Sequence, residues 1–138
     1  MKRTATAIWK GSLKEGYGVI STQSAVLNST KYDFKSRFAD GTSTNPDELL
    51  AAAHAGCFAM ALSLILGEAG FTADSIEASS TLNMDADKLA LTTAHLILKA
   101  KIPQISKEKF LECAQAAKDN CPVSKALSLP ITLDATLL

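Results

Sequence analysis

The sequence lacks an excess of charge of either sign. Its 138 residues carry 14 basic and 14 acidic side chains, which cancel at neutral pH. Domains that bind nucleic acid, and proteins that adsorb to anionic membranes, usually present a strongly basic surface. The charge balance therefore gives no reason to expect nucleic acid or membrane as a partner.

Cysteine is also scarce, and the three cysteines are an odd number. An odd, small number argues against the disulfide framework of a secreted domain. The first ten residues include basic side chains but no long apolar run follows them, so they do not resemble a secretory signal. We expect a cytoplasmic protein, a setting that favours a catalytic over a structural role for any cysteine pair.

Long hydrophobic runs are absent apart from residues 49–66. A membrane span needs about 20 apolar residues. This run is slightly shorter, and His54, Gly56 and Ser63 interrupt it. We interpret it as a buried core helix.

The length suits one domain over residues 1–138, and the local patterns predict strands and helices that are unevenly distributed. Strands are predicted over 4–9, 19–27, 32–38, 75–85, 89–102 and 131–137, and helices over 46–66, 107–120 and 122–127. Adjacent strands favour antiparallel pairing. The pattern therefore predicts an α+β fold rather than a doubly wound α/β fold.

The helix over 46–66 has the best-marked start in the sequence. Asn45 suits the cap, Pro46 the first helical position, and Asp47 and Glu48 the acidic first turn. Beyond that turn the helix is apolar almost all round, which requires nearly complete burial. Because a small domain can hardly enclose such a helix, we expect a homodimer with the helix near the interface.

Cys57 lies within this helix among small residues. A free cysteine in such a place is often only a small core hydrophobe. Gly56 beside it costs about 1 kcal/mol relative to alanine, which suggests that the backbone or a partner needs the space. The small neighbours also leave room for a substrate beside the sulfur.

Cys121 precedes Pro122 at the expected start of a helix. Free amides and the helix dipole at that position favour a thiolate, although the cysteine could also merely mark a helix boundary. Cys113 shares a helical stripe with Phe110 and Ala117, so core packing explains it.

Arg37 is one of only two arginines and lies just before the loop that leads to the Cys57 helix. Its forked donors suit a thiolate and a peroxide oxygen. Asp47 or Glu48 could orient it through a bidentate pair, and both acids could equally serve only the helix terminus. A weaker alternative is a metal-dependent hydrolase, in which His54, Cys57 and Cys121 would ligate zinc.

Two motifs carry a resemblance to a known family. Residues 42–63, TSTNPDELLAAAHAGCFAMALS, resemble the central helix of the OsmC/Ohr family, and Cys121-Pro122-Val123-Ser124 resembles its second cysteine motif. The similarity extends over nearly the whole chain. It implies an α+β, OsmC-like fold in which antiparallel sheets of two intertwined chains wrap long buried central helices.

The resemblance also implies a function. It identifies Cys57 as the peroxidatic and Cys121 as the resolving cysteine of a thiol-dependent peroxidase that reduces organic hydroperoxides without metal or bound cofactor. Arg37 matches the arginine of the OsmC branch, which comes from the strand before the loop. An external dithiol, such as a lipoylated protein, would regenerate the pair.

One departure concerns the acid that orients the arginine. The family usually has glutamate directly after Asn-Pro, whereas this chain has Asp47 there and Glu48 next. Either acid could serve. An apolar pocket from Phe58, Met60 and the interface is expected to favour alkyl peroxides. The remaining alternative is a dimeric redox-sensing or ligand-binding module without sustained turnover.

Overall fold

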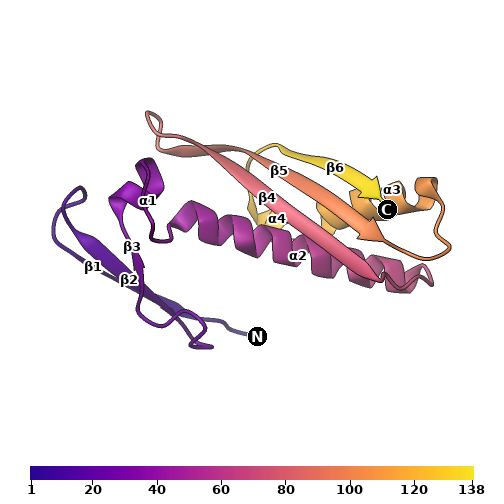
Figure 1. The fold of residues 1–138 in the computed structure, drawn as a ribbon, viewed down its shortest axis with the longest axis horizontal. Coiled ribbons are helices and arrows are strands. Elements are labelled where there is room, and N and C mark those ends of the chain that lie inside the picture. Colours follow the sequence, from indigo (N-terminus) through magenta and orange to yellow (C-terminus); the bar gives the residue numbers. More distant parts are fainter. The chain divides into compact units, whose positions relative to one another are not determined.

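The computed structural model describes residues 1–138 and contains two compact units, residues 1–49 and 50–138 (Figure 1). Helices and small sheets occur together without a doubly wound sheet, so the predicted α+β class is confirmed.

The first unit contains a three-stranded antiparallel sheet. Its strands are β1 (Ala5–Lys10), β2 (Tyr17–Thr22) and β3 (Thr30–Tyr32), in the order β1-β2-β3. Gly18 on β2 lies where any Cβ would collide with the rings of Trp9 and Tyr32. Glycine therefore lets these two rings pack, with centroids 5.4 Å apart.

The strand predicted over 32–38 is wrong. The chain instead forms a short helix, α1 (Phe34–Phe38), directly after β3. Asp33 caps it, because its carboxylate accepts a hydrogen bond from the Ser36 amide at 2.9 Å. A capping side chain outweighs the β propensity of this segment. Arg37 therefore comes from a helix and not from a strand.

The strand predicted over 19–27 is shorter than expected. β2 ends at Thr22, whose amide donates to the Leu27 carbonyl at 2.9 Å. The Thr22 hydroxyl accepts from the Leu27 amide at 3.2 Å. A turn closed by these bonds, with Ala25 at φ 61°, replaces the end of the predicted strand.

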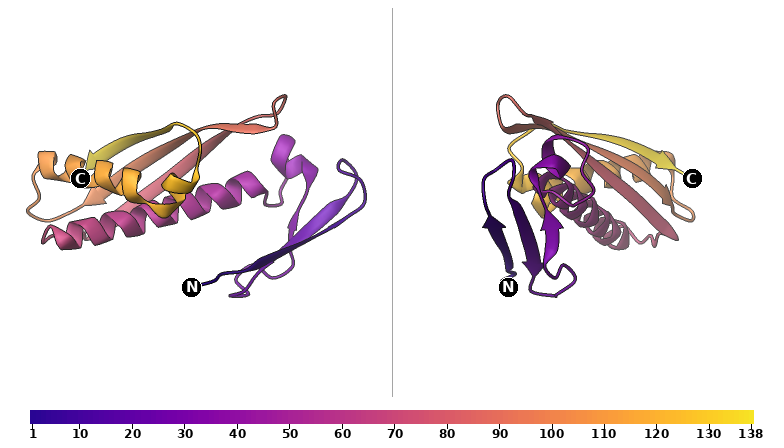
Figure 2. Two further views of the ribbon diagram at one scale, coloured as in Figure 1. Left: turned by 180° about the vertical axis from the view of Figure 1, so that it is seen from behind. Right: turned by 60° about the vertical axis from the view of Figure 1, so that its left-hand side comes forward.

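The second unit contains a sheet with helices on one face (Figures 1 and 2). The strands are β4 (Ser75–Asp85), β5 (Ala90–Lys101) and β6 (Ile131–Leu137), in the order β4-β5-β6. The helices are α2 (Pro46–Glu68), whose first turn lies in the first unit, α3 (Lys107–Asn120) and α4 (Pro122–Ala126). Each lies where the sequence predicts it.

The core of this unit forms between the sheet and the helices. Alternate residues of β5 point inward and are fully buried from Ala94 to Ala100. They pack in one cluster with α2 and α3, whose buried members include Phe58, Leu62 and Phe110. This packing fixes the face of α2 that carries His54 and Phe58.

One strand pair departs from the antiparallel expectation. β4 and β5 pair antiparallel, as predicted, but β6 lies parallel to β5. The segment between β5 and β6 contains α3 and α4, and such a crossover brings the chain back to the same end of the sheet.

Burial of α2 is one-sided in the single chain. His54, Phe58, Leu62 and Leu66 are buried, whereas Met60 is 76% exposed. By length and composition α2 could span a bilayer, a weak indication because core helices of soluble proteins pass the same test. The nearly complete burial expected from the sequence is therefore not reached within one chain, and the expected homodimer stays a prediction.

Candidate active site

Two cysteines meet in the second unit. Cys57 comes from the middle of α2, and Cys121 stands at the junction where α3 ends and α4 begins. Both are free thiols, they belong to one packed cluster, and each affects the pKa of the other. Cys121 is fully buried and Cys57 half-buried, so solvent reaches the pair from the Cys57 side. Cys113 is buried in the core, as predicted.

The surroundings of the two sulfurs affect their pKa values in opposite directions. Burial raises the pKa of Cys57, and the hydrogen bond with Cys121 raises it further. Burial also raises the pKa of Cys121, but hydrogen bonds from Cys57, Ser124 and the Val123 amide outweigh it and bring that pKa below its usual value. These amides belong to the first turn of α4, where free N–H groups stabilise a thiolate.

His54 lies one helical turn before Cys57 and is fully buried. Its Nδ1 is 2.9 Å from the Ser80 hydroxyl, and its Nε2 is 2.9 Å from the Ser124 hydroxyl. Burial lowers the pKa of His54, so the ring is neutral near pH 7. The sequence analysis singled out His54 but missed both serines. They are distant along the chain, and only the nearness of Ser124 to Cys121 in the sequence hinted at a role.

The metal-site alternative finds no ligand set. Hydroxyl groups take up both ring nitrogens of His54. Nowhere in the chain do three His, Cys, Asp or Glu side chains gather in a way that could hold a metal ion.

Arg37 and Asp47 form a two-pronged ion pair in the first unit. The Arg37 Nε donates to Asp47 Oδ2 and its Nη2 donates to Asp47 Oδ1, each at 3.2 Å. Glu48 instead accepts from the Thr44 hydroxyl at 2.9 Å. Of the two candidate acids, Asp47 is thus the one that contacts Arg37. The shorter side chain reaches the guanidinium because α1 brings Arg37 to the start of α2.

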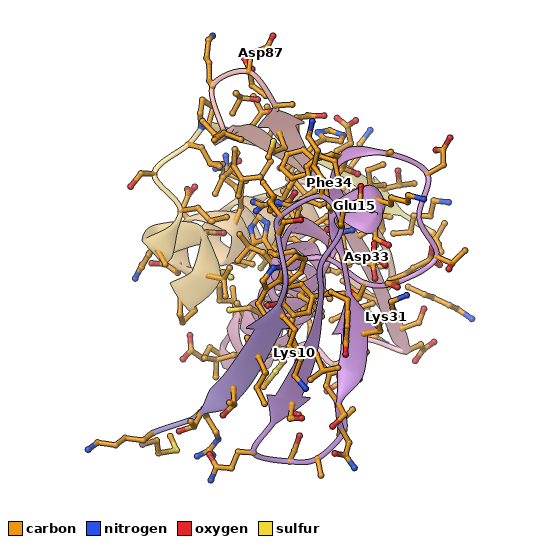
Figure 3. All side chains as sticks on the ribbon, turned by 90° about the vertical axis from the view of Figure 1, so that its left-hand side faces the viewer. Lys10, Glu15, Lys31, Asp33, Phe34 and Asp87 are labelled. Atoms are coloured by element: carbon orange, nitrogen blue, oxygen red, sulfur yellow. The ribbon has the colours of Figure 1, made fainter.

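A cavity of about 260 Å³ lies beside this ion pair. Its lining is almost wholly apolar: Trp9, Leu13, Tyr32, Phe34, Phe38 and Pro46, together with Asp33 and Arg37. Asp33 and Phe34 enter it from the junction of β3 and α1 (Figure 3). The Arg37 guanidinium also lies over the Phe38 ring, 5.4 Å from its centroid.

The sequence predicts an apolar pocket formed by Phe58, Met60 and the interface, and this prediction is wrong for Phe58. Phe58 is fully buried against the sheet and presents no surface to a ligand, whereas Met60 is exposed. Two residues two positions apart on a helix point to different sides. The apolar lining found by the structure comes from β1, β3 and α1 instead.

The chain is similar to known proteins over most of its length. The family model described as "OsmC-like protein" matches residues 39–136. "Peroxiredoxin OsmC" of Escherichia coli (strain K12) is 45% identical over 133 residues, which cover 95% of this chain and 93% of that protein. "Organic hydroperoxide resistance protein-like 1" of Staphylococcus epidermidis is 37% identical over 94 residues, 64% of each protein.

Solved structures share the fold. The organic hydroperoxide resistance protein OhrB of Bacillus subtilis superposes with a TM-score of 0.67 at 27% identity and covers 96% of this chain and 98% of its own. An OsmC-like protein from Mycoplasma pneumoniae superposes with a TM-score of 0.77 at 18% identity over 100% of this chain and 98% of its own. The second likeness concerns the fold alone.

Proposed function

The chain belongs to the OsmC-like protein family, and we propose that it reduces organic hydroperoxides to alcohols with Cys57 and Cys121 as its redox pair. The relatives in Escherichia coli and Staphylococcus epidermidis are named as a peroxiredoxin and an organic hydroperoxide resistance protein-like protein. The observation that carries the proposal is the packing of two free thiols, far apart in the sequence, into one cluster where each affects the pKa of the other. A pair brought together in this way can form a disulfide when its geometry allows.

The reaction runs in three balanced steps. The Cys57 thiolate attacks the terminal oxygen of the hydroperoxide, the O–O bond breaks, and the alkoxide takes up a proton and leaves as an alcohol. Cys57 is thereby oxidised to a sulfenic acid. The Cys121 thiolate then attacks the Cys57 sulfur, the S–S bond forms, and the hydroxyl group leaves as water. An external dithiol reduces the disulfide by exchange and becomes a disulfide itself.

Arg37 is the cation that we assign to the first step. Burial raises the pKa of Cys57, so this thiol needs an additional positive group to become the nucleophile. A guanidinium is always charged and offers donors to both a thiolate and a peroxide oxygen. Asp47 holds its Nε and one terminal nitrogen and leaves the other terminal nitrogen for the substrate.

The apolar cavity beside Arg37 supports alkyl hydroperoxides as substrates. Its aromatic and aliphatic lining gains free energy by covering an alkyl group, roughly 0.8 kcal/mol for each buried methylene. Hydrogen peroxide has no group that could fill it. We therefore expect faster turnover of an alkyl hydroperoxide than of hydrogen peroxide, and equal rates would contradict this use of the cavity.

The protein's partners follow from the same proposal. A homodimer would cover the exposed face of α2, where a Cβ added at Gly56 would face open space in the single chain. The reductant is an external dithiol, for which a lipoylated protein is a candidate, and the working place is the cytoplasm. We treat residues 1–138 as one functional domain.

A peroxide titration tests the proposal. The Cys113→Ser protein is fully reduced, mixed with one equivalent of an alkyl hydroperoxide, and analysed for free thiols and cross-linked peptides. We expect the loss of two thiols per chain and a Cys57–Cys121 link. Sustained alcohol formation with a dithiol distinguishes a peroxidase from a redox-sensing module, which would oxidise only once. If Cys57 remained reduced while the peroxide survived, the proposal would fail.

A further inference from the structure

A buried row of polar side chains leads to the sulfur of Cys121. It runs from Ser80 on β4 through His54 on α2 to Ser124 on α4, with both contacts to the imidazole at 2.9 Å. Ser124 stands in the first turn of α4, three residues after Cys121, and is among the groups that lower the pKa of that thiol. The imidazole is fully buried and Ser124 nearly so. The peroxidase steps described above do not use this row.

The proton positions in the row follow from counting donors. A serine hydroxyl has one proton. If Ser124 donates it to the Cys121 sulfur, then the Nε2 of His54 must carry a proton and donate it to the Ser124 oxygen. The ring is neutral, so Nδ1 is unprotonated and accepts from the Ser80 hydroxyl. In this arrangement the Ser80 hydroxyl, the His54 Nε2–H and the Ser124 hydroxyl each donate in the direction of the Cys121 sulfur.

We propose that His54, acting through Ser124, is a positioning residue that keeps a hydroxyl proton directed at the sulfur of Cys121. The imidazole does not touch the sulfur or the substrate. By donating from Nε2 it fills an acceptor site of the Ser124 oxygen and leaves the hydroxyl proton free for Cys121. Ser80 fixes the ring tautomer that makes this possible.

The inference rests on the proposed function, because it concerns Cys121 as the resolving residue. A hydrogen bond to the sulfur raises the fraction of Cys121 that is thiolate and able to attack the Cys57 sulfenic acid. The same hydrogen bond favours reduction of the Cys57–Cys121 disulfide. In that step an external dithiol attacks the half-buried Cys57, and the buried Cys121 leaves as a thiolate. A leaving thiol with a lower pKa leaves faster.

The opposing explanation is a purely structural one, in which two serines merely satisfy a buried histidine. Only the positioning role predicts that a change at His54 alters the pKa of Cys121. No charged side chain contributes to the pKa of His54, for which burial is the cause, and only Cys57, Val123 and Ser124 offset burial at Cys121. The Ser124 contact is therefore the one that variants of His54 can alter.

The first experiment measures the pKa of Cys121 directly. In a Cys57→Ser, Cys113→Ser background, Cys121 is the only thiol, and its thiolate is followed by ultraviolet absorbance against pH. We expect His54→Leu and Ser124→Ala each to raise its pKa by about one unit, since a hydrogen bond to a charged group is worth roughly that much. His54→Gln keeps a donor near the Nε2 position and should stay close to the parent value.

The second experiment follows the Cys57 sulfenic acid in the chain that retains both cysteines. We expect the alkyl hydroperoxide to oxidise Cys57 at the parent rate in His54→Leu. Disulfide formation should then slow by about threefold, because the loss of thiolate is partly offset by a more nucleophilic sulfur. More sulfenic acid should be trapped by dimedone. His95→Gln, a change at the other histidine of the chain, serves as the control and should match the parent.

The outcomes separate the inference from the proposed function. If Ser124→Ala left the pKa of Cys121 unchanged, or if His54→Gln behaved like His54→Leu, the inference would be overturned even in an active peroxidase. Should His54→Leu not fold, Ser124→Ala decides alone, because it removes a single oxygen. If the parent failed to react with peroxide, the proposed function would fail, and the pKa measurement would still test the hydrogen-bonded row.

Discussion

The two neighbouring acids at the start of α2 have different partners. Asp47 contacts Arg37 through both oxygens, whereas Glu48 accepts from Thr44 across the first turn of α2. Glu48 therefore stabilises the helix start and Asp47 orients the arginine. Adjacent carboxylates in one helical turn thus serve different purposes because they point in different directions.

We predict unequal effects for the amide variants of these two acids. Asp47→Asn should lower the rate of Cys57 oxidation by about tenfold, since the lost bidentate pair lets Arg37 move, and a charge-assisted hydrogen bond is worth roughly 1.5–3 kcal/mol. Glu48→Gln should change it by less than about twofold, as expected for an exposed helix-end charge. Stopped-flow oxidation by an alkyl hydroperoxide measures both. Equal small effects would exclude an acid from the orientation of Arg37.

His54 should make the stability of the protein depend on pH. Its pKa is lowered in the folded state by burial, so below pH of about 6.5 the unfolded chain binds a proton that the folded chain does not. Stability is therefore complete above that pH and falls as the pH decreases, by at most about 1.4 kcal/mol per pH unit. Urea unfolding from pH 7.5 to 5 measures the slope. His54→Gln should flatten it, and an unchanged slope would mean that other groups cause the dependence.

The helix α2 combines two different faces. Leu62 is fully buried in the core of the second unit, and Leu64, two positions later, is 65% exposed. Phe58 and His54 share the buried face, so the same packing that anchors the helix also holds the imidazole beside Ser124. The position of Cys57 near the edge of this face explains why it is half-buried.

The two faces predict different costs of truncation. Leu62→Ala should destabilise the chain by about 3 kcal/mol, as is typical when a buried leucine leaves a cavity. Leu64→Ala loses no contact with its own core and should cost less than about 1 kcal/mol, apart from any effect on association. Chemical denaturation at low protein concentration compares the pair. A large loss for Leu64→Ala there would mean that its face is covered in the state that unfolds.

At the scale of the whole molecule, one face of α2 is not covered by its own chain. A Cβ added at Gly56 would face open space, although glycine inside a helix costs roughly 1 kcal/mol relative to alanine. A second copy that packs closely against this face would account for the glycine.

Substitution of Gly56 tests that explanation. A Cβ at position 56 faces open space in the single chain and leucine improves helix propensity, so we expect the Gly56→Leu monomer to fold normally. In a dimer packed through this face the new side chain would collide with the partner, and the protein should become monomeric. Light scattering at micromolar concentration measures the molar mass in solution, and Gly56→Ala, which adds a smaller side chain, serves as the control. A protein that is monomeric before any substitution would contradict the homodimer.

The sequence by itself determined the features that depend on neighbouring residues. The caps Asn45 and Ser106, the alternation along β4 and β5, and the start of α4 at Pro122 all placed elements correctly, because caps and periodicity act within a few residues. The two cysteine motifs were visible for the same reason. α1 differs from the strand that the sequence predicts, because Asp33 caps a helix in a segment whose neighbours have β propensity.

The tertiary structure alone decided what depends on residues distant along the chain. The parallel placement of β6, the packing of Cys57 and Cys121 into one cluster, and the full burial of Phe58 each require segments that meet only after folding. Ser80 became a partner of His54 in the same way. The sequence pattern shows which side of a helix or strand is apolar, but not which side chains of another element will pack against it. The chemistry of this site depends on those contacts between distant segments.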